Sequence, residues 1–252
     1  MLMCGTDVLC DAATRRTAVA GFVAYNLEMA QGVVEAAERS ELPVVLQAGS
    51  GPFKHAGWTL ATIALSLAQM TDADVGVHLG HSKSLDEIEI CLRLGYTSVM
   101  ADFAHLPFDD NITLTREAAK RSHDYGAWIE ARVNNRLHTA EFVGLTGIDM
   151  LAVSVHNDSD VDGLRVLRKE AGIPLALDDA TEVAADTLLD CLDHGVAKVN
   201  VDAQLRRAFL TAQSDAVPDA LRSDDITKAL GAGREAIATT AARIALLLAR
   251  SS

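Results

Sequence analysis

The regular alternation of short apolar runs with longer amphipathic stretches is the feature that most constrains the fold of this chain. Runs of strand length occupy residues 18–25, 43–47, 75–79, 97–101, 127–131, 150–155, 174–177 and 197–201. They are continuously apolar, which is typical of parallel strands buried on both faces. Between them, stretches such as 27–40, 84–95 and 183–195 carry apolar residues at helical spacing. Eight such units predict an α/β fold, a (β/α)8 TIM barrel, with a doubly wound parallel sheet as the alternative.

The chain shows no internal boundary, because no linker, low-complexity tract or shift of composition interrupts it. We therefore expect residues 1–252 to form a single domain. Helical periodicity from Asp224 to about Arg250 predicts a C-terminal helix. Its apolar part, Ile237 to Leu248, suits core packing or, alternatively, contact with a second copy in a homo-oligomer.

Charge and cysteine usage narrow the classes of partner. The 22 Lys and Arg against 35 Asp and Glu give a net charge of −13, and no run of five or more basic residues occurs. We therefore expect no nucleic acid and no anionic membrane as partner.

No stretch of 18 uninterrupted apolar residues is present, and the four cysteines lack CxxC spacing. These observations predict a cytoplasmic protein in a reducing compartment.

Polar residues follow the predicted strands, at the end of a barrel where active sites form. They are Asn26, Gln47, His78, His81, Asp102, Glu130, His156, Asn157, Asp178, Asp179, Asn200 and Asp202. Loops and helix N-caps supply some polar residues in any fold. Several histidines and carboxylates on one rim nevertheless predict a site for a small molecule. Lys54, beside a Gly-Ser-Gly turn at 49–51, is a further candidate for binding an anion, with a plain turn as the alternative.

Several segments, in order along nearly the whole chain, match the motifs of one family. The stretch VHLGHSKSLDEIEICLRLGYTSVMADFAHLPFDDNI is similar to that family's segments HLDHG, SVMIDGS and LPFEEN. The similarity continues through YNLEMAQGVVEAAE, LQAGSGPFKHAG, IEA, TGIDMLAVSVH, GIPLAL, HGVAKVNVDAQLRRAF and KALGAGREAI. The chain thus resembles the class II, metal-dependent fructose-bisphosphate and tagatose-bisphosphate aldolases, which implies the same barrel fold.

The resemblance also implies a metal site. His81 falls on one zinc-binding histidine of the family and His156 on a second, while Asp178 stands where the third would be. These three residues imply a divalent metal ion, zinc first and Fe(II) or Mn(II) as alternatives. The other interpretation is that His156 caps a loop and Asp178 starts a turn.

Four acidic residues are the catalytic candidates, namely Asp102, Glu130, Asp179 and Asp202. Asp102 and Glu130 fall on acidic residues that the family keeps at the metal site. The other interpretation of Glu130 is a structural ion pair with Arg132, two residues further on. Asn26, Gln47, Lys54 and Asn200 are the candidates for substrate binding.

The departures from the family pattern concern catalysis and phosphate binding. Gly80 stands where the family has the Asp that handles a hydroxyl proton, so we expect Asp179 or Asp202 to act as general base instead. Residues 179–182, DATE, replace the phosphate-binding GGSG, and Ala203 replaces a Thr. Only VNNRLH follows the fifth strand region, where the family has a long loop with a catalytic Glu.

The resemblance, taken with these departures, implies a lyase that makes or breaks a carbon–carbon bond next to a carbonyl. Its substrate is expected to be a small, non-bisphosphorylated sugar-like compound or oxo acid, and fructose 1,6-bisphosphate is not expected to be cleaved. One alternative is a different reaction on the same barrel, such as an isomerase, an epimerase or a metal-free lyase. The other is a non-catalytic descendant that binds a ligand or a protein.

Overall fold

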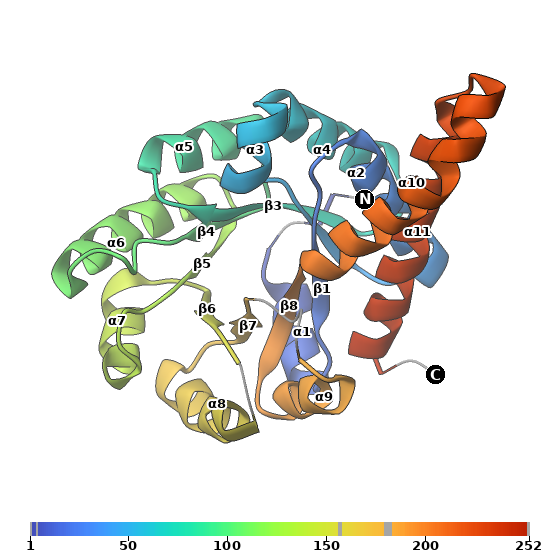
Figure 1. The fold of residues 1–252 in the computed structure, drawn as a ribbon. Helices are drawn as coiled ribbons and strands as arrows, with labels where there is room; N and C mark the ends of the chain where they lie inside the picture. The colour runs from blue at the N-terminus through green and yellow to red at the C-terminus, as the bar shows by residue number, and fades with distance from the viewer. Residues whose placement is uncertain (1, 4, 156–157, 179–182, 251–252) are drawn as a thin grey trace.

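The computed structural model describes residues 2–3, 5–155, 158–178 and 183–250. Eight parallel strands close into a barrel in sequence order, with β1 paired to both β2 and β8 (Figure 1). Each lies within or overlaps one of the eight apolar runs, so the predicted barrel is confirmed and a doubly wound sheet is excluded. The strands are β1 Val19–Val23, β2 Val44–Gln47, β3 Val75–Ser82, β4 Ser98–Ala101, β5 Trp128–Ala131, β6 Met150–Val153, β7 Leu175–Leu177 and β8 Val196–Val201.

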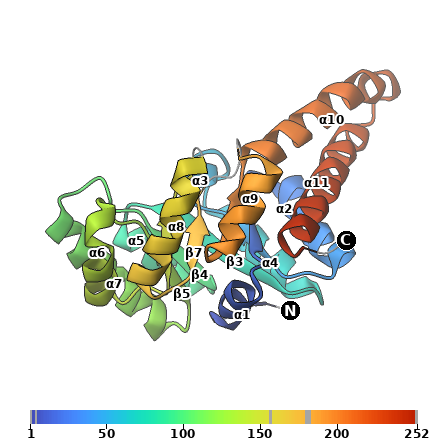
Figure 2. The same ribbon diagram turned by 90° about the horizontal axis from the view of Figure 1, so that it is seen from below.

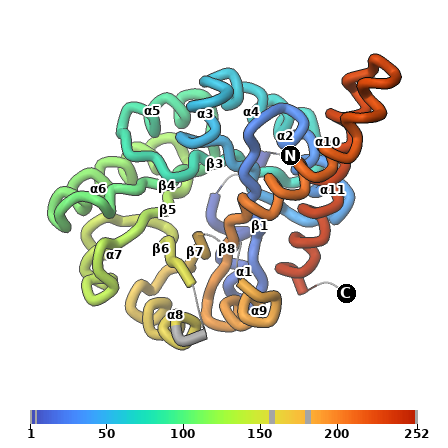
Figure 3. Tube along the Cα trace, in the orientation of Figure 1, coloured from blue at the N-terminus to red at the C-terminus, as the bar shows by residue number. Residues whose placement is uncertain are grey.

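Helices surround the barrel, and the trace in Figure 3 runs once round it from β1 to β8. The predicted C-terminal helix is observed as α11, preceded by a long α10 that forms a hairpin with it. The helices are α1 Asp7–Arg15, α2 Leu27–Ser40, α3 Ser50–Ala56, α4 Thr59–Met70, α5 Leu85–Leu94, α6 Phe108–Asp124, the 3-10 turn η1 Arg136–His138, α7 Thr139–Thr146, α8 Asp158–Ala171, α9 Ala185–Asp193, α10 Ala203–Ser223 and α11 Thr227–Leu248.

Helix α1 closes the barrel at the N-terminal ends of its strands. Leu9 and Ala12 of this helix are buried against Val19, Val45 and Ala197, which lie at or near the starts of their strands. Burial of these side chains removes apolar surface from water at about 25 cal/mol per Å² and leaves the opposite end of the barrel for chemistry.

The C-terminal helix packs on α2 through its apolar face. Ile237, Ala241 and Ile244 are buried, and a Cβ at Gly32 of α2 would lie only 2.7 Å from the Cβ of Ile237. This close approach requires glycine. The hairpin of α10 and α11 then leaves the barrel on the side away from α1, as Figure 2 shows. No helix of the described segments is long and apolar enough to cross a bilayer.

Candidate functional site

His81 reaches the rim because β3 is irregular at its C-terminal end. The pairing of β3 with β4 shifts register between Leu79 and Ser82, which is a bulge. His81 has φ of 52°, in the left-handed region that non-glycine residues seldom adopt. Bulges re-aim side chains at the edges of sheets, and strained backbone is found at functional sites. The sequence HLGHS therefore turns the imidazole out of the barrel wall.

Glu87 of α5 holds this irregular end of β3 in place. Its carboxylate accepts hydrogen bonds from the hydroxyls of Ser82, at 2.6 Å, and of Ser50 on α3, at 2.5 Å. Hydrogen bonds to a charged acceptor are the stronger kind. These two hydrogen bonds connect the end of β3 to the start of α3 beside His81.

His81 lies at the centre of a charged group that we call the rim cluster, made of His81, Asp102, Arg132 and Asp178. Nδ1 of His81 is 3.1 Å from Oδ2 of Asp102, and Nε2 is 3.1 Å from Oδ1 of Asp178. The first contact is a hydrogen bond, whereas the second is an ion-pair approach, since Oδ1 of Asp178 has no hydrogen-bond partner among the described residues. The guanidinium of Arg132 contacts Oδ2 of Asp178 directly. The ends of β3, β4, β5 and β7 thus meet in one cluster.

Asp102 is held in its ionised form by this arrangement. The hydrogen bond from His81 lowers the pKa of the Asp102 carboxyl, and the charges of His81 and Arg132 lower it further against the opposing effect of burial. A carboxylate on Nδ1 fixes the orientation of an imidazole. Asp102 is therefore a positioning group for His81.

Beneath the rim, Glu130 is paired with Lys198 and not with Arg132. Nζ of Lys198 donates to Oε2 of Glu130 at 2.7 Å, and both side chains are fully buried inside the barrel. The alternative interpretation of Glu130, a structural ion pair, is confirmed, but the predicted partner Arg132 is wrong because Arg132 pairs with Asp178. Burial lowers the pKa of Lys198, opposed by the charge of Glu130.

His78 and Trp128 complete this lower layer. The ring of Trp128 stacks on His78 with centroids 5.3 Å apart, and Nζ of Lys198 lies 5.6 Å from a Trp128 ring centroid. Nδ1 of His78 is 2.9 Å from Oγ of Ser98. The layer places a cation, an anion and two aromatic rings directly under the rim cluster.

Gln47 and Asn200, two substrate-binding candidates, lie side by side across β1. Nε2 of Gln47 donates to Oδ1 of Asn200 at 2.6 Å, and both residues are buried. A Cβ at Gly21 would lie 2.4 Å from Nε2 of Gln47, so this amide pair fills the space that a side chain on β1 would take. Each amide keeps further hydrogen-bonding capacity for a polar ligand.

Gln47 also lies close to Gly80, the glycine beside His81. A Cβ at Gly80 would lie 3.2 Å from Oε1 of Gln47, and a Cβ at Gly49 would lie 2.7 Å from backbone atoms of Gly80. The chain is packed tightly here, and Gly80 offers no group for proton transfer.

The remaining candidates are more dispersed. Asn26 caps α2, with its side chain accepting from the backbone N–H of Met29 at 2.9 Å. Lys54 is exposed on α3. Asp202 precedes α10, where it accepts from the hydroxyl of Tyr25 at 3.1 Å and from Nε of Arg206 at 2.8 Å.

Three of the polar residues predicted at the strand ends, His156, Asn157 and Asp179, lie outside the described residues. The roles of Arg132 in the rim cluster and of Lys198 beneath it were missed by sequence reasoning. The sequence indicates Arg132 only as a possible ion-pair partner of Glu130, two residues away. A lysine inside the apolar run AKVNV was the available signal for a buried ion pair, because an uncompensated charge is costly there.

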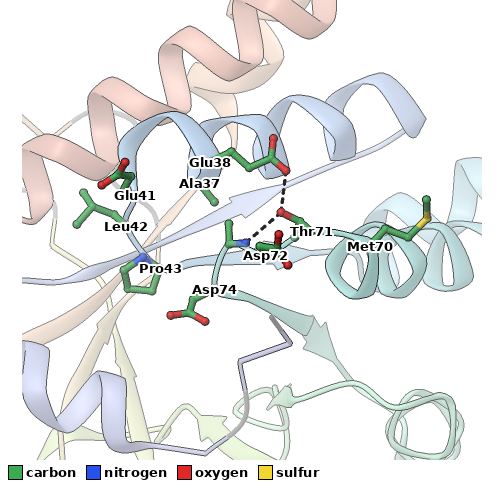
Figure 4. Close-up of a pocket in the computed structure, with 10 residues that line it drawn as sticks. Ala37, Glu38, Glu41, Leu42, Pro43, Met70, Thr71, Asp72 and Asp74 are labelled. Carbon is green, nitrogen blue, oxygen red and sulfur yellow. Dashed lines mark hydrogen bonds between the residues drawn. The ribbon is translucent and has the colours of Figure 1, made fainter.

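A separate hollow of about 540 Å³ lies at the other end of the strands (Figure 4). It is lined by carboxylates that precede β2 and β3, including Glu41 and Asp74, and the hydroxyl of Thr71 donates to Glu38 at 2.7 Å. The N-terminal face of a barrel of this kind contributes stability and not catalysis. The rim cluster is therefore the candidate active site.

Fold and site together define a (β/α)8 barrel with a polar, charged mouth, and the family model of class-II fructose-bisphosphate aldolase matches residues 5–251. The chain belongs to the class II fructose-bisphosphate aldolase family. It is 27% identical to the fructose-bisphosphate aldolases of Giardia intestinalis, over 92% of this chain and 88% of that protein, and of Thermus caldophilus, over 94% of each.

A solved structure supports the same assignment. The YdjI aldolase from Escherichia coli K12 superposes with a TM-score of 0.89 at 27% identity, covering 98% of this chain and 97% of the other. The family assignment supports an aldolase-like lyase that acts on a small molecule.

Class II aldolases generally depend on a divalent metal ion, but the described residues of the rim do not fit one. Among the described residues, one imidazole nitrogen and one carboxylate oxygen converge, from His81 and Asp178, and no group of three or more metal-ligating side chains is found there. His156, the other predicted ligand, lies outside the described residues. Arg132 already pairs with Asp178. A guanidinium in contact with Asp178 would repel a divalent ion held by the same carboxylate, which opposes metal binding here.

Proposed function

We propose that the chain is a lyase that makes or breaks a carbon–carbon bond next to the carbonyl of a small, non-bisphosphorylated sugar-like compound or oxo acid. The observation that carries this proposal is the rim cluster, in which His81 faces Asp102 and Asp178 at the mouth of a class II aldolase barrel. The absence of a side chain at Gly80 and the acidic sequence at 179–182 argue against the standard substrate.

In cleavage, a general base removes the hydroxyl proton from the carbon that becomes an aldehyde. The carbon–carbon bond breaks, and its electrons move onto the carbonyl-bearing fragment as an enolate. Asp202 is a candidate base, because it lies at the end of β8 beside Tyr25, and Asp179 is the other candidate. Synthesis is the reverse of these steps.

Other rim groups bind and orient. His81, held by Asp102, is positioned to exchange a proton with the departing or attacking fragment. Gln47 and Asn200 offer amide groups to substrate hydroxyls, since only one hydrogen bond joins them. The free cysteines Cys10, Cys91 and Cys191 among the described residues are compatible with the proposed cytoplasmic location.

A substrate panel tests the proposal. Purified protein is incubated with phosphate-free ketoses, hydroxylated oxo acids and fructose 1,6-bisphosphate, and aldehyde release is followed by NMR. We expect cleavage of a phosphate-free compound, and for the bisphosphate a rate lower by about 10² to 10⁴, the usual contribution of general acid–base groups. Turnover of the bisphosphate near about 10 per second, the median for enzymes, would contradict the proposal.

A matched pair of variants controls this assay. Asp202→Asn removes a candidate base at the rim, whereas Asp219→Asn removes an exposed carboxylate of α10, the helix that follows Asp202, which pairs with Lys228. We expect Asp219→Asn to retain full activity. Isomerised or epimerised products without any aldehyde would favour the other reaction classes, and a panel without any turnover would favour a ligand-binding role.

A further inference from the structure

Two buried atoms of the rim cluster, Nε of Arg132 and Oδ1 of Asp178, have no hydrogen-bond partner among the described residues, although Oδ1 lies 3.1 Å from Nε2 of His81. The side chain of Asp178 is only 6% exposed. Proteins keep nearly all buried polar atoms paired, so a donor and an acceptor without hydrogen bonds from the described residues favour a bound ligand as their partner. The donor suits a carbonyl oxygen, and the acceptor suits a hydroxyl group.

Arg132 is also the permanent positive charge of this cluster. It follows β5 directly, and its guanidinium contacts Asp178, whose other carboxylate oxygen faces His81. A guanidinium stays protonated at every relevant pH. The charge therefore stands beside the place that an ion between His81 and Asp178 would occupy.

We propose that Arg132 replaces the divalent metal ion as the positive charge that stabilises the enolate in this chain. The inference rests on the proposed lyase function. Nε–H of Arg132 donates to the substrate carbonyl oxygen, which becomes negative as the carbon–carbon bond breaks. A donor aimed at developing negative charge lowers the barrier in the way an oxyanion hole does. Asp178 accepts from the neighbouring hydroxyl, so the ligand class is an α-hydroxy carbonyl compound.

A cobalt titration tests whether Arg132 excludes the metal. Co²⁺ is added to purified full-length protein, and binding is followed by calorimetry and by the visible absorption of the ion. We expect the wild type and Arg132→Lys, which keeps the charge, to bind Co²⁺ negligibly. Arg132→Gln is expected to bind at least about 100-fold more tightly, or roughly 2.7 kcal/mol.

Control variants locate the ion and the effect. Arg136→Gln, which removes a nearby guanidinium that donates to the backbone of Ser154, is expected to behave as the wild type. Adding Asp178→Asn to Arg132→Gln is expected to abolish the gained binding. If Arg132→Gln does not fold by circular dichroism, Arg132→Met serves as the neutral variant.

Three outcomes overturn the proposal. They are one equivalent of firmly held metal in the wild type as purified, equal Co²⁺ affinity in the wild type and the neutral variant, and gained binding that survives Asp178→Asn. The titration needs no substrate, so a failed substrate panel contradicts the lyase function without deciding whether Arg132 excludes metal.

Discussion

At the scale of single residues, His78 couples the stability of the barrel to pH. Complete burial lowers its pKa well below 6.5, and the nearby charges of Lys198 and His81 add to this effect. The folded state therefore keeps His78 neutral at a pH where the unfolded chain takes up a proton. Because the folded pKa is the lower one, the contribution to stability is present above pH 6.5 and is lost as pH falls below it.

We predict that His78→Phe makes stability less dependent on pH. Between pH 6.5 and 5.0 the wild type is expected to lose more unfolding free energy than the variant, because its unfolded chain takes up a proton at His78 that its folded state does not. Urea unfolding at both pH values measures the difference. His55→Gln, which removes an exposed imidazole, is the control and should follow the wild type. Equal pH dependence of wild type and His78→Phe would contradict the prediction.

The ion-pair partners of Glu130 and Arg132 could not be predicted from the sequence. The run IEARVNN places Glu130 and Arg132 two residues apart, which is correct spacing for an ion pair on one strand face. β5 ends at Ala131, however, so Arg132 is already in the loop and is free to turn to Asp178. Lys198 of β8 takes the pairing with Glu130 from the opposite side of the barrel. Such contacts form only once the barrel closes, so the spacing of residues within one segment does not predict them.

At the scale of elements, the eight strands were predictable because burial on both faces makes their sequences continuously apolar. The end of β3 was not, because Gly80, His81 and Ser82 are not an apolar run, and pairing with β4 extends the strand past Leu79. Helix α1 was also missed, although its few apolar residues include the buried Leu9. Its place under the barrel is set by the starts of several strands together.

The close packing of Gly21 on β1 against Gln47 and Asn200 can be tested by substitution. We predict that Gly21→Ala destabilises the protein by about 1 to 3 kcal/mol, the usual cost of overpacking, because the new Cβ meets Gln47 and Asn200. Gly51→Ala on α3 is the matched control, since nothing lies within 4 Å of a Cβ there and alanine favours a helix by about 0.5 to 1 kcal/mol. Urea unfolding compares the two, and equal stability of both variants would show that the Gln47–Asn200 pair moves at no cost.

At the scale of the whole molecule, the α10–α11 hairpin is the part that the barrel does not need for closure. Its base is used in the core, because Ile237 and Ile244 of α11 are buried. Its outer end, which projects from the barrel in Figure 2, carries Leu221 and Ile226 at 78% and 71% exposure. Exposed large apolar side chains grouped at one end of a hairpin are typical of an interaction surface.

We therefore predict a homo-oligomer that forms through the end of this hairpin. Light scattering is expected to give a multiple of the 26.8 kDa chain mass, and Leu221→Glu together with Ile226→Glu is expected to reduce it to the single-chain value. The reason is that the glutamate carboxylates would be buried in the interface without a partner of opposite charge, which is strongly unfavourable. Met70→Glu, at an 84% exposed apolar residue of α4 outside the hairpin, should leave the mass unchanged. A single-chain mass for the wild type would mean that the hairpin end faces solvent or a different protein, and a single-chain mass for Met70→Glu alone would move the interface to α4.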